Sequence, residues 1–318
     1  MNNIIDEIKK VGNIVLLCHN NPDGDAIGST IAMYYILKKL NKEVDIVIEK
    51  PPVRFSYIKG FELIKNTSNK EYDTAIILDT AKEERINDPS NIVEKVSKKI
   101  VIDHHISNSN YGDVNYVEDS PACCQVIYNI AKELNIEIDE LIGIPLYTGL
   151  VTDSGNLSYP SVTTETFEMA ADLSKIVNTS KISTLALNTI TKEPFELKKI
   201  GMNNIEFYKD NQISLLTITE EDINKIGVDK SEVDILTNIG REIEGIKVTI
   251  FIRIYTDEIK VSLRSNDINV NEIANIFGGG GHINAAGITI TDIDYEEVKQ
   301  KLLEEVGKKI DEWNISSK

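Results

Sequence analysis

Four histidines occur in the 318-residue chain, and all of them fall in segments whose residue types suit chemistry. Three are accompanied by aspartates, in the segments His19-Asn-Asn-Pro-Asp23-Gly-Asp25 and Asp103-His104-His105. Two further aspartates, Asp79 and Asp153, each follow an apolar stretch. Imidazole and carboxylate groups are ligands that suit manganese, iron, cobalt or zinc. The pattern therefore predicts a metal site built from segments that lie far apart in the sequence.

The spacing of the aspartates favours two metal ions rather than one. Asp23 and Asp25 are two residues apart in a segment where Pro22 and Gly24 favour a tight turn, so each carboxylate could face a different ion. Asp79 could bridge the two ions. A pair of ions about 3.5–4 Å apart clamps a phosphoryl group and generates hydroxide near neutral pH. A single Asp-x-Asp segment is more often a solvated turn, so the prediction depends on the ordered combination of all the motifs.

Short apolar runs precede three of the motifs and predict the strands that position them. Strands are expected at residues 14–18, 43–48, 74–78 and 99–102, with helices at 29–40 and 121–134. Ser120 and Pro121 suit the N-cap and the first position of the second helix. Strands that alternate with helices predict a parallel sheet with helices on both faces, and ligands bind beyond the carboxyl ends of such strands. Asp153 would instead follow a helix over residues 141–151.

The second half of the chain predicts a smaller domain. A polar stretch over residues 194–208 suits a linking helix. Strands are expected at residues 212–218, 247–255 and 258–264, and helices at 270–277 and 295–313. We therefore predict an α/β protein: a parallel-sheet domain at 1–190, a helical linker at 191–211, and a second α/β domain with a mixed sheet at 212–318.

Composition limits the partners of this chain. Hydrophobic residues make up 41% and charged residues 27%, as in ordinary globular proteins. The net charge of −17 argues against long duplex nucleic acid as a partner, because phosphate neutralisation supplies most of that affinity. No apolar run approaches the roughly 18 residues of a membrane span. Cys18, Cys123 and Cys124 form no disulfide framework, and the first residues do not resemble a signal peptide, so we expect a cytoplasmic protein.

The ordered motifs resemble those of the DHH phosphoesterase superfamily, named for the triplet seen here as Asp103-His104-His105. The resemblance implies two Mn²⁺ ions per subunit, with Asp79 shared between them. One ion would be held by His19, Asp23 and Asp79, and the other by Asp25, Asp79, His104 and Asp153. Two catalytic roles are also implied. Asp103 would orient the histidines, and His105 would contact the scissile phosphate or the leaving oxygen.

A run of four glycines near the C-terminus resembles the signature of the DHH-associated domain of the first type. It reads Gly278-Gly279-Gly280-Gly281-His282 and is followed by Ile-Asn-Ala-Ala-Gly. Glycines let backbone N–H groups approach a phosphate or base edge, although a flexible loop is the alternative explanation. The expected substrate-binding residues are therefore Gly279, Gly280, Gly281, His282 and Arg264. Ser29 and Thr30 could also bring the start of a helix toward a phosphate.

Within the superfamily, the chain most resembles enzymes of the nano-RNase type. Such enzymes degrade RNAs of two to five nucleotides to mononucleotides and dephosphorylate adenosine 3′,5′-bisphosphate (pAp) to AMP. RecJ exonucleases normally carry added nucleic-acid-binding domains, and family II pyrophosphatases lack the glycine run. A phosphodiesterase of cyclic dinucleotides or of pApA stays open as the alternative. A non-catalytic nucleotide-binding module is disfavoured because no metal ligand is missing. The resemblance also implies a homodimer.

Overall fold

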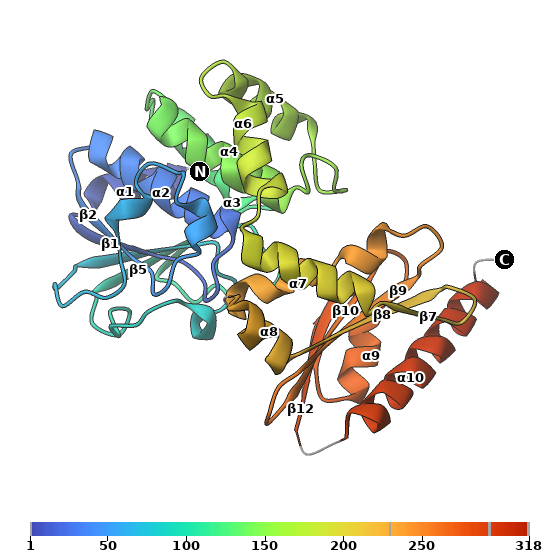
Figure 1. The fold of residues 1–318 in the computed structure, drawn as a ribbon. Coiled ribbons are helices and arrows are strands. Elements are labelled where there is room, and N and C mark those ends of the chain that lie inside the picture. The colour runs from blue at the N-terminus through green and yellow to red at the C-terminus, as the bar shows by residue number, and fades with distance from the viewer. Residues whose placement is uncertain (1, 229, 292–293, 317–318) are drawn as a thin grey trace. The chain divides into compact units, whose positions relative to one another are not determined.

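The chain folds into two compact units, Met1–Thr189 and Ile190–Lys318. The computed structural model describes residues 2–228, 230–291 and 294–316 (Figure 1). No helix in these ranges is long and apolar enough to span a membrane. Each unit contains one six-stranded sheet with its own hydrophobic core, so the two sheets are described separately.

The sheet of the first unit is parallel throughout, as the sequence predicts, and its strand order is β3-β2-β1-β4-β5-β6. Its strands are β1 (Asn13–Leu17), β2 (Glu43–Val47), β3 (Ile64–Lys65), β4 (Thr74–Leu78), β5 (Lys98–Asp103) and β6 (Val114–Val117). Because β4 lies between β1 and β5, the residues that follow these three strands meet at one edge of the sheet. This edge therefore receives three of the sequence motifs.

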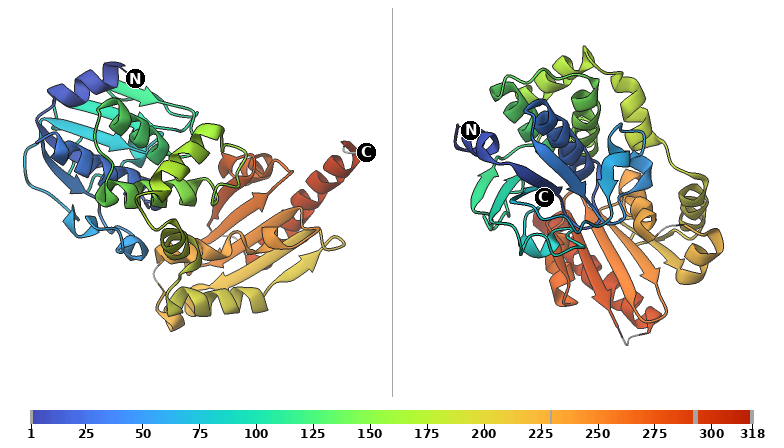
Figure 2. Two further views of the ribbon diagram at one scale, coloured as in Figure 1. Left: turned by 90° about the horizontal axis from the view of Figure 1, so that it is seen from above. Right: turned by 90° about the vertical axis from the view of Figure 1, so that its left-hand side faces the viewer.

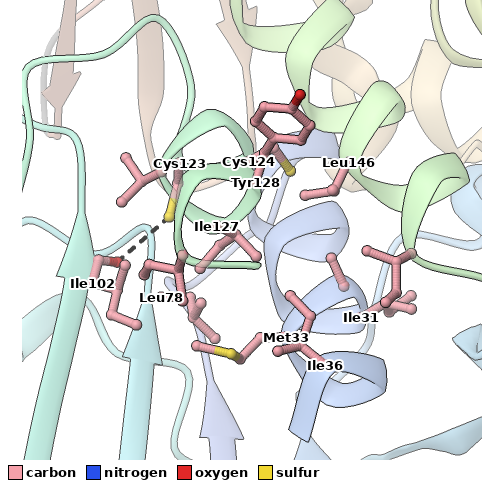
Figure 3. Close-up of a cluster of buried hydrophobic side chains, with 14 of the residues drawn as sticks. Ile31, Met33, Ile36, Leu78, Ile102, Cys123, Cys124, Ile127, Tyr128 and Leu146 are labelled. Carbon is pink, nitrogen blue, oxygen red and sulfur yellow. Dashed lines mark hydrogen bonds between the residues drawn. The ribbon is translucent and has the colours of Figure 1, made fainter. Parts of the chain in front are cut away.

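The helices of the first unit lie on one face of this sheet, α1, α2 and α3 against the strands and the others outside them (Figure 2). They are α1 (Asn2–Lys10), α2 (Gly24–Lys39), α3 (Cys123–Glu133), α4 (Glu140–Asp153), α5 (Thr164–Ser174) and α6 (Thr179–Ser183). Short 3₁₀ segments form η1 (Val53–Phe55), η2 (Phe61–Leu63) and η3 (Glu83–Arg85), and η4 (Thr184–Asn188) is a π-helical turn. In the core, α2 and α3 pack on β4 and β5, and the Sγ of buried Cys123 donates to the carbonyl of Ile102 at 3.5 Å (Figure 3).

The expectation of helices on both faces is wrong for this unit. The opposite face buries alternate strand residues such as Val15, Ile77 and Val101 against Tyr72 and Ile92. None of the residues that cover this face lies in an α-helix. The reason is that the β4–β5 connection, residues 79–97, contains only η3 as regular structure.

Two helix starts also differ from the prediction. Helix α2 begins at Gly24, five residues early, because the Asp23 carboxylate caps it by accepting from the N–H groups of Asp25 and Ala26. Ser29 and Thr30 consequently lie inside the helix and are fully buried, so they cannot present its N-terminus to a phosphate. Helix α3 begins at Cys123 with Ala122 at the N-cap, in place of Ser120.

The second unit has a mixed sheet of order β11-β12-β10-β9-β8-β7, in which only the β8–β9 pair is parallel. Its strands are β7 (Glu206–Tyr208), β8 (Ile213–Thr219), β9 (Val248–Ile254), β10 (Ile259–Ser265), β11 (Gly280–His282) and β12 (Ala285–Ile290). Its helices are α7 (Lys192–Asn203), α8 (Glu220–Ile226), α9 (Val270–Ile276) and α10 (Tyr295–Ser316), with 3₁₀ segments η5 (Lys230–Leu236) and η6 (Ile239–Glu242).

Helices cover one face of this second sheet and part of the other. Helices α9 and α10 bury one face, as Figure 1 shows, and α7, α8 and the 3₁₀ segments bury the part of the other face that β8 and β9 form. The predicted helix over residues 194–208 ends at Asn203, and Glu206–Tyr208 is an edge strand instead. Leu197 of α7 is fully buried in the core of this unit.

Close packing of α2 against α4 generates a prediction about stability. A Cβ atom added at Gly28 would collide with the carbonyl oxygen of Pro145 and lie 3.0 Å from the Sγ of Cys124. We expect Gly28→Ala to lower the free energy of unfolding by about 1–3 kcal/mol, measured by urea denaturation. Gly12→Ala is the matched control, because the nearest atom to its Cβ would be 3.9 Å away, and its effect should stay within about 0.5 kcal/mol. Equal effects of the two changes would contradict this packing.

Candidate metal centre

Asp79 directly follows β4, at the edge of the first sheet that receives the sequence motifs. Its backbone has a left-handed φ of 52°, which an aspartate tolerates at a small cost, and its N–H donates to the Ile102 carbonyl on β5 at 3.0 Å. The carboxylate is buried, with 3% exposure. Among the described residues, none forms a well-shaped hydrogen bond to its Oδ1. A buried carboxylate oxygen without a donor is an unfavourable arrangement that a bound cation would relieve.

One group of possible ligands consists of His19, Asp23 and Asp79. The Nε2 of His19 lies 3.6 Å from Asp79 Oδ2 and 3.9 Å from Asp23 Oδ1. Its Nδ1 lies 2.8 Å from the carbonyl oxygen of Asn20, so Nδ1 carries the proton and Nε2 faces the carboxylates with its lone pair when the ring is neutral. This is the orientation that a metal-binding imidazole requires.

A second group consists of Asp25, His104 and Asp153. His104 Nε2 lies 3.4 Å from Asp153 Oδ2, 3.9 Å from Asp25 Oδ2 and 3.3 Å from Asp79 Oδ1. The Nδ1 of His104 lies 2.9 Å from the carbonyl oxygen of Ser120, which fixes the ring as Asn20 fixes His19. Asp79 therefore adjoins both groups through its two oxygens.

The Asp25 carboxylate has a structural role as well. It accepts from the backbone N–H groups of Cys123 and Cys124 at 2.6 and 2.9 Å, at the first turn of α3. Asp25 itself lies in the first turn of α2, so it ties the beginnings of two helices together. Asp153, in contrast, is the last residue of α4 and is partly exposed.

Asp103 and His105 form a separate pair beside this cluster. Asp103 Oδ1 lies 2.8 Å from His105 Nδ1, and Asp103 Oδ2 accepts from the side-chain amide of Asn108 at 2.6 Å. His105 Nδ1 is 3.6 Å from Asp79 Oδ1. Asp103 thus orients His105 alone, whereas the Ser120 carbonyl orients His104. Asn108 has no place in the sequence motifs, although it follows the triplet by only three residues.

The charges of the site are unfavourable without a cation. Burial, and then the Asp79 charge, raise the pKa of Asp25 to about 7, and burial and Asp25 raise the pKa of Asp153 to about 8. Burial lowers the pKa of His104, but Asp79, Asp25 and Asp153 outweigh it and raise that pKa to about 11. A set of imidazoles and carboxylates that competes for protons in this way fits a divalent cation, which would neutralise the carboxylates.

A cavity of about 140 Å³ opens beside this cluster. Its walls are formed by His19, Asp23, Asp79, Ala81, Arg85 and His105. Arg85 belongs to η3 and to none of the sequence motifs. Only the backbone pairing of residues 85–87 with the His19 segment brings it to the cavity, so no sequence signal identifies it.

The substrate-binding residues expected in the second unit lie on adjacent strands. Arg264 on β10 is directly opposite Ala285 on β12, which in turn is opposite His282 on β11. The register therefore places Arg264 and His282 in one row on one face of the sheet. Burial lowers the pKa of Arg264, which still leaves a guanidinium charged at neutral pH.

The glycine run forms an ordered hairpin rather than a loop. A Cβ atom at Gly279 would collide with the carbonyl oxygen of Gly287, and one at Gly281 with the carbonyl oxygen of Ala285. The N–H of Gly281 donates to the Oδ1 of Asn271 at 2.8 Å. Packing of the β11–β12 hairpin alone thus requires glycine at these two positions, whatever else the hairpin binds.

Comparisons with known proteins agree with this fold. Residues 13–150 match the model of the DHH family, N-terminal domain, and residues 212–312 match the DHHA1 domain. A Thermus thermophilus protein described as bifunctional oligoribonuclease and PAP phosphatase NrnA is 29% identical over 95% of this chain and 92% of its own length. A Mycoplasma genitalium protein of the same description is 30% identical over 91% of this chain and 92% of its own.

Among solved structures, an exopolyphosphatase-related protein from Bacteroides fragilis superposes with a TM-score of 0.85 at 25% identity, over 96% of each chain. Fold and site together define a phosphoesterase, as the sequence motifs predict. The chain belongs to the DHH family and carries a DHHA1 domain in its second unit.

The shared position of Asp79 generates a prediction about metal binding. Asp79→Asn should weaken Mn²⁺ binding by at least about 100-fold. Loss of a residue that only hydrogen-bonds to a metal ligand costs about 10–100-fold in affinity, and Asp79 is expected to be a ligand itself. Isothermal titration calorimetry on metal-stripped protein measures this. Asp73→Asn is the matched control, because Asp73 is exposed and flanks the opposite end of β4. Mn²⁺ affinity that is the same in both variants would contradict the assignment of this cluster as a metal centre.

Proposed function

We propose that the first unit holds two Mn²⁺ ions and hydrolyses phosphate esters. His19, Asp23 and Asp79 would hold one ion, and Asp25, Asp79, His104 and Asp153 the other. The observation that carries the proposal is the buried Asp79 carboxylate, whose two oxygens adjoin two separate groups of ligands. A pair of such ions supplies a nucleophile near neutral pH and neutralises charge on the phosphoryl oxygens.

The residues around the ions have roles of their own. His105 lines the cavity, and Asp103 holds its Nδ1, which leaves Nε2 for an oxygen of the scissile phosphate or of the leaving group. Asn108 fixes the second oxygen of Asp103, so the pair keeps one orientation. This arrangement supports Asp103 as a positioning residue and His105 as a group that touches the substrate.

For the substrate we propose short oligoribonucleotides, cleaved to mononucleotides, and pAp, dephosphorylated to AMP. Relatives described as bifunctional oligoribonucleases and PAP phosphatases align over more than nine-tenths of this chain, which supports the same pair of activities. The net charge of −17 also favours a short substrate over a long one, because a long nucleic acid needs many basic contacts.

We propose that residues of the second unit bind the part of the substrate that does not react. They are Arg264, Gly279, Gly280, Gly281 and His282. Arg264 and His282 share one row of the sheet, and a guanidinium suits the two oxygens of a terminal phosphate. We accordingly propose residues 1–190 as the catalytic domain, 212–318 as the substrate-binding domain and 191–211 as the segment that connects them.

A product profile tests the substrate assignment. With Mn²⁺ present, chromatography should show that RNAs of two to five nucleotides and pAp are both consumed, and that Asp79→Ala consumes neither, since it lacks the shared ligand. Asp73→Ala should match the unaltered protein. Much faster consumption of pApA or cyclic di-AMP than of these substrates would overturn the assignment in favour of second-messenger turnover. Undiminished hydrolysis by Asp79→Ala would overturn the two-ion mechanism itself.

A further inference from the structure

Arg85 is a positively charged residue in the wall of a cavity that three candidate metal ligands, His19, Asp23 and Asp79, also line. It lies in η3, between β4 and β5, and shares the cavity with His19, Asp79 and His105. The chain contains five arginines, and only Arg54 and Arg85 belong to the first unit. A guanidinium beside the candidate metal centre therefore needs its own explanation.

The backbone around Arg85 is held firmly against the His19 segment. The Arg85 carbonyl accepts from the N–H of Asn20 at 2.7 Å, and the N–H of Asn87 donates to the Cys18 carbonyl at 2.8 Å. The Asn87 side chain also bonds both the N–H and the carbonyl of Glu49. Backbone hydrogen bonds thus hold Arg85 itself and Asn87, two residues further on. This pairing fixes the position of the Arg85 backbone beside the cavity.

The guanidinium of Arg85 has no ion-pair or hydrogen-bond partner within the described part of the chain. Asp23 and Asp79 line the same cavity, yet neither carboxylate lies within ion-pairing distance of Arg85. The arginines of the second unit differ: Arg241 bonds Asn266, Arg253 bonds Asp234, and Arg264 bonds its neighbouring carbonyl. The guanidinium of Arg85 therefore does not pair with the carboxylates of the cavity. It can bind an anion while the carboxylates bind cations.

We propose that Arg85 binds a non-bridging oxygen of the phosphate that is hydrolysed at this site. The proposal rests on the proposed phosphoesterase function and adds a residue to it. A guanidinium presents a rigid fork of N–H donors that matches phosphate oxygens and stabilises the charge that they carry in the transition state. Arg85 supplies this charge from the first unit itself, at the cavity that His105 also lines.

Kinetics on the Mn²⁺-loaded full-length protein tests this role. Arg85→Ala should lower kcat/KM for pAp by roughly 10²–10³-fold, the usual cost of losing one donor to a charged transition state. Arg85→Lys should retain part of the activity, because it keeps the charge but loses the fork. Added guanidinium should partly restore Arg85→Ala. Lys82→Ala is the matched control: it removes one positive charge from the same exposed segment but not from the cavity wall.

A binding measurement separates this role from structural ones. Inorganic phosphate titrated into Mn²⁺-loaded protein should bind Arg85→Ala at least about tenfold more weakly than Lys82→Ala, while Mn²⁺ affinity stays unchanged. Equal kinetics and equal phosphate affinity in these two variants would overturn the proposal, as would a loss of Mn²⁺ binding in Arg85→Ala. If the unaltered protein hydrolysed no phosphate ester, the proposed function would fail instead, and the phosphate titration would still decide the role of Arg85.

Discussion

The position of one carboxylate, that of Asp79, governs the rest of the site. It is buried at the end of β4 with a left-handed backbone, and β4 is flanked by β1 and β5. This order of strands places His19 on one side of Asp79 and the Asp103-His104-His105 triplet on the other. A parallel sheet that changes strand order in this way brings groups from distant segments to one edge, where ligands bind. The strand order therefore places imidazole groups and further carboxylates around the buried Asp79 carboxylate.

Electrostatics explains why the same residues also affect folding. Asp23 caps α2, and Asp25 accepts two N–H groups at the start of α3, so these carboxylates have favourable partners even before a cation binds. Burial and neighbouring carboxylates raise the pKa of Asp25 and of Asp153, whereas His19 and His104 hold the pKa of Asp79 low. A divalent cation would remove the penalty on ionising Asp25 and Asp153. Metal binding and stability of the first unit are consequently linked.

Sequence patterns identified β1, β4 and β5 and the motifs that follow them, because each of these three motifs directly follows a short apolar run. They failed where tertiary contacts decide. Pro22 and Gly24 suggested a turn, but Asp23 starts a helix there. The second face of the first sheet is covered without α-helices, which no periodicity indicates. Arg85 reaches the site through backbone pairing with the distant His19 segment, and Asn108 through a side-chain hydrogen bond to Asp103, and neither residue belongs to a motif.

The groups around Asp79 are proposed to bind divalent cations. Anomalous X-ray diffraction at the manganese absorption edge, on crystals grown with Mn²⁺, would locate these ions. We expect two anomalous peaks next to Asp79, one beside His19 and Asp23 and the other beside Asp25, His104 and Asp153. Peaks elsewhere with none at Asp79, or no peak at a Mn²⁺ concentration that supports hydrolysis, would contradict the proposal.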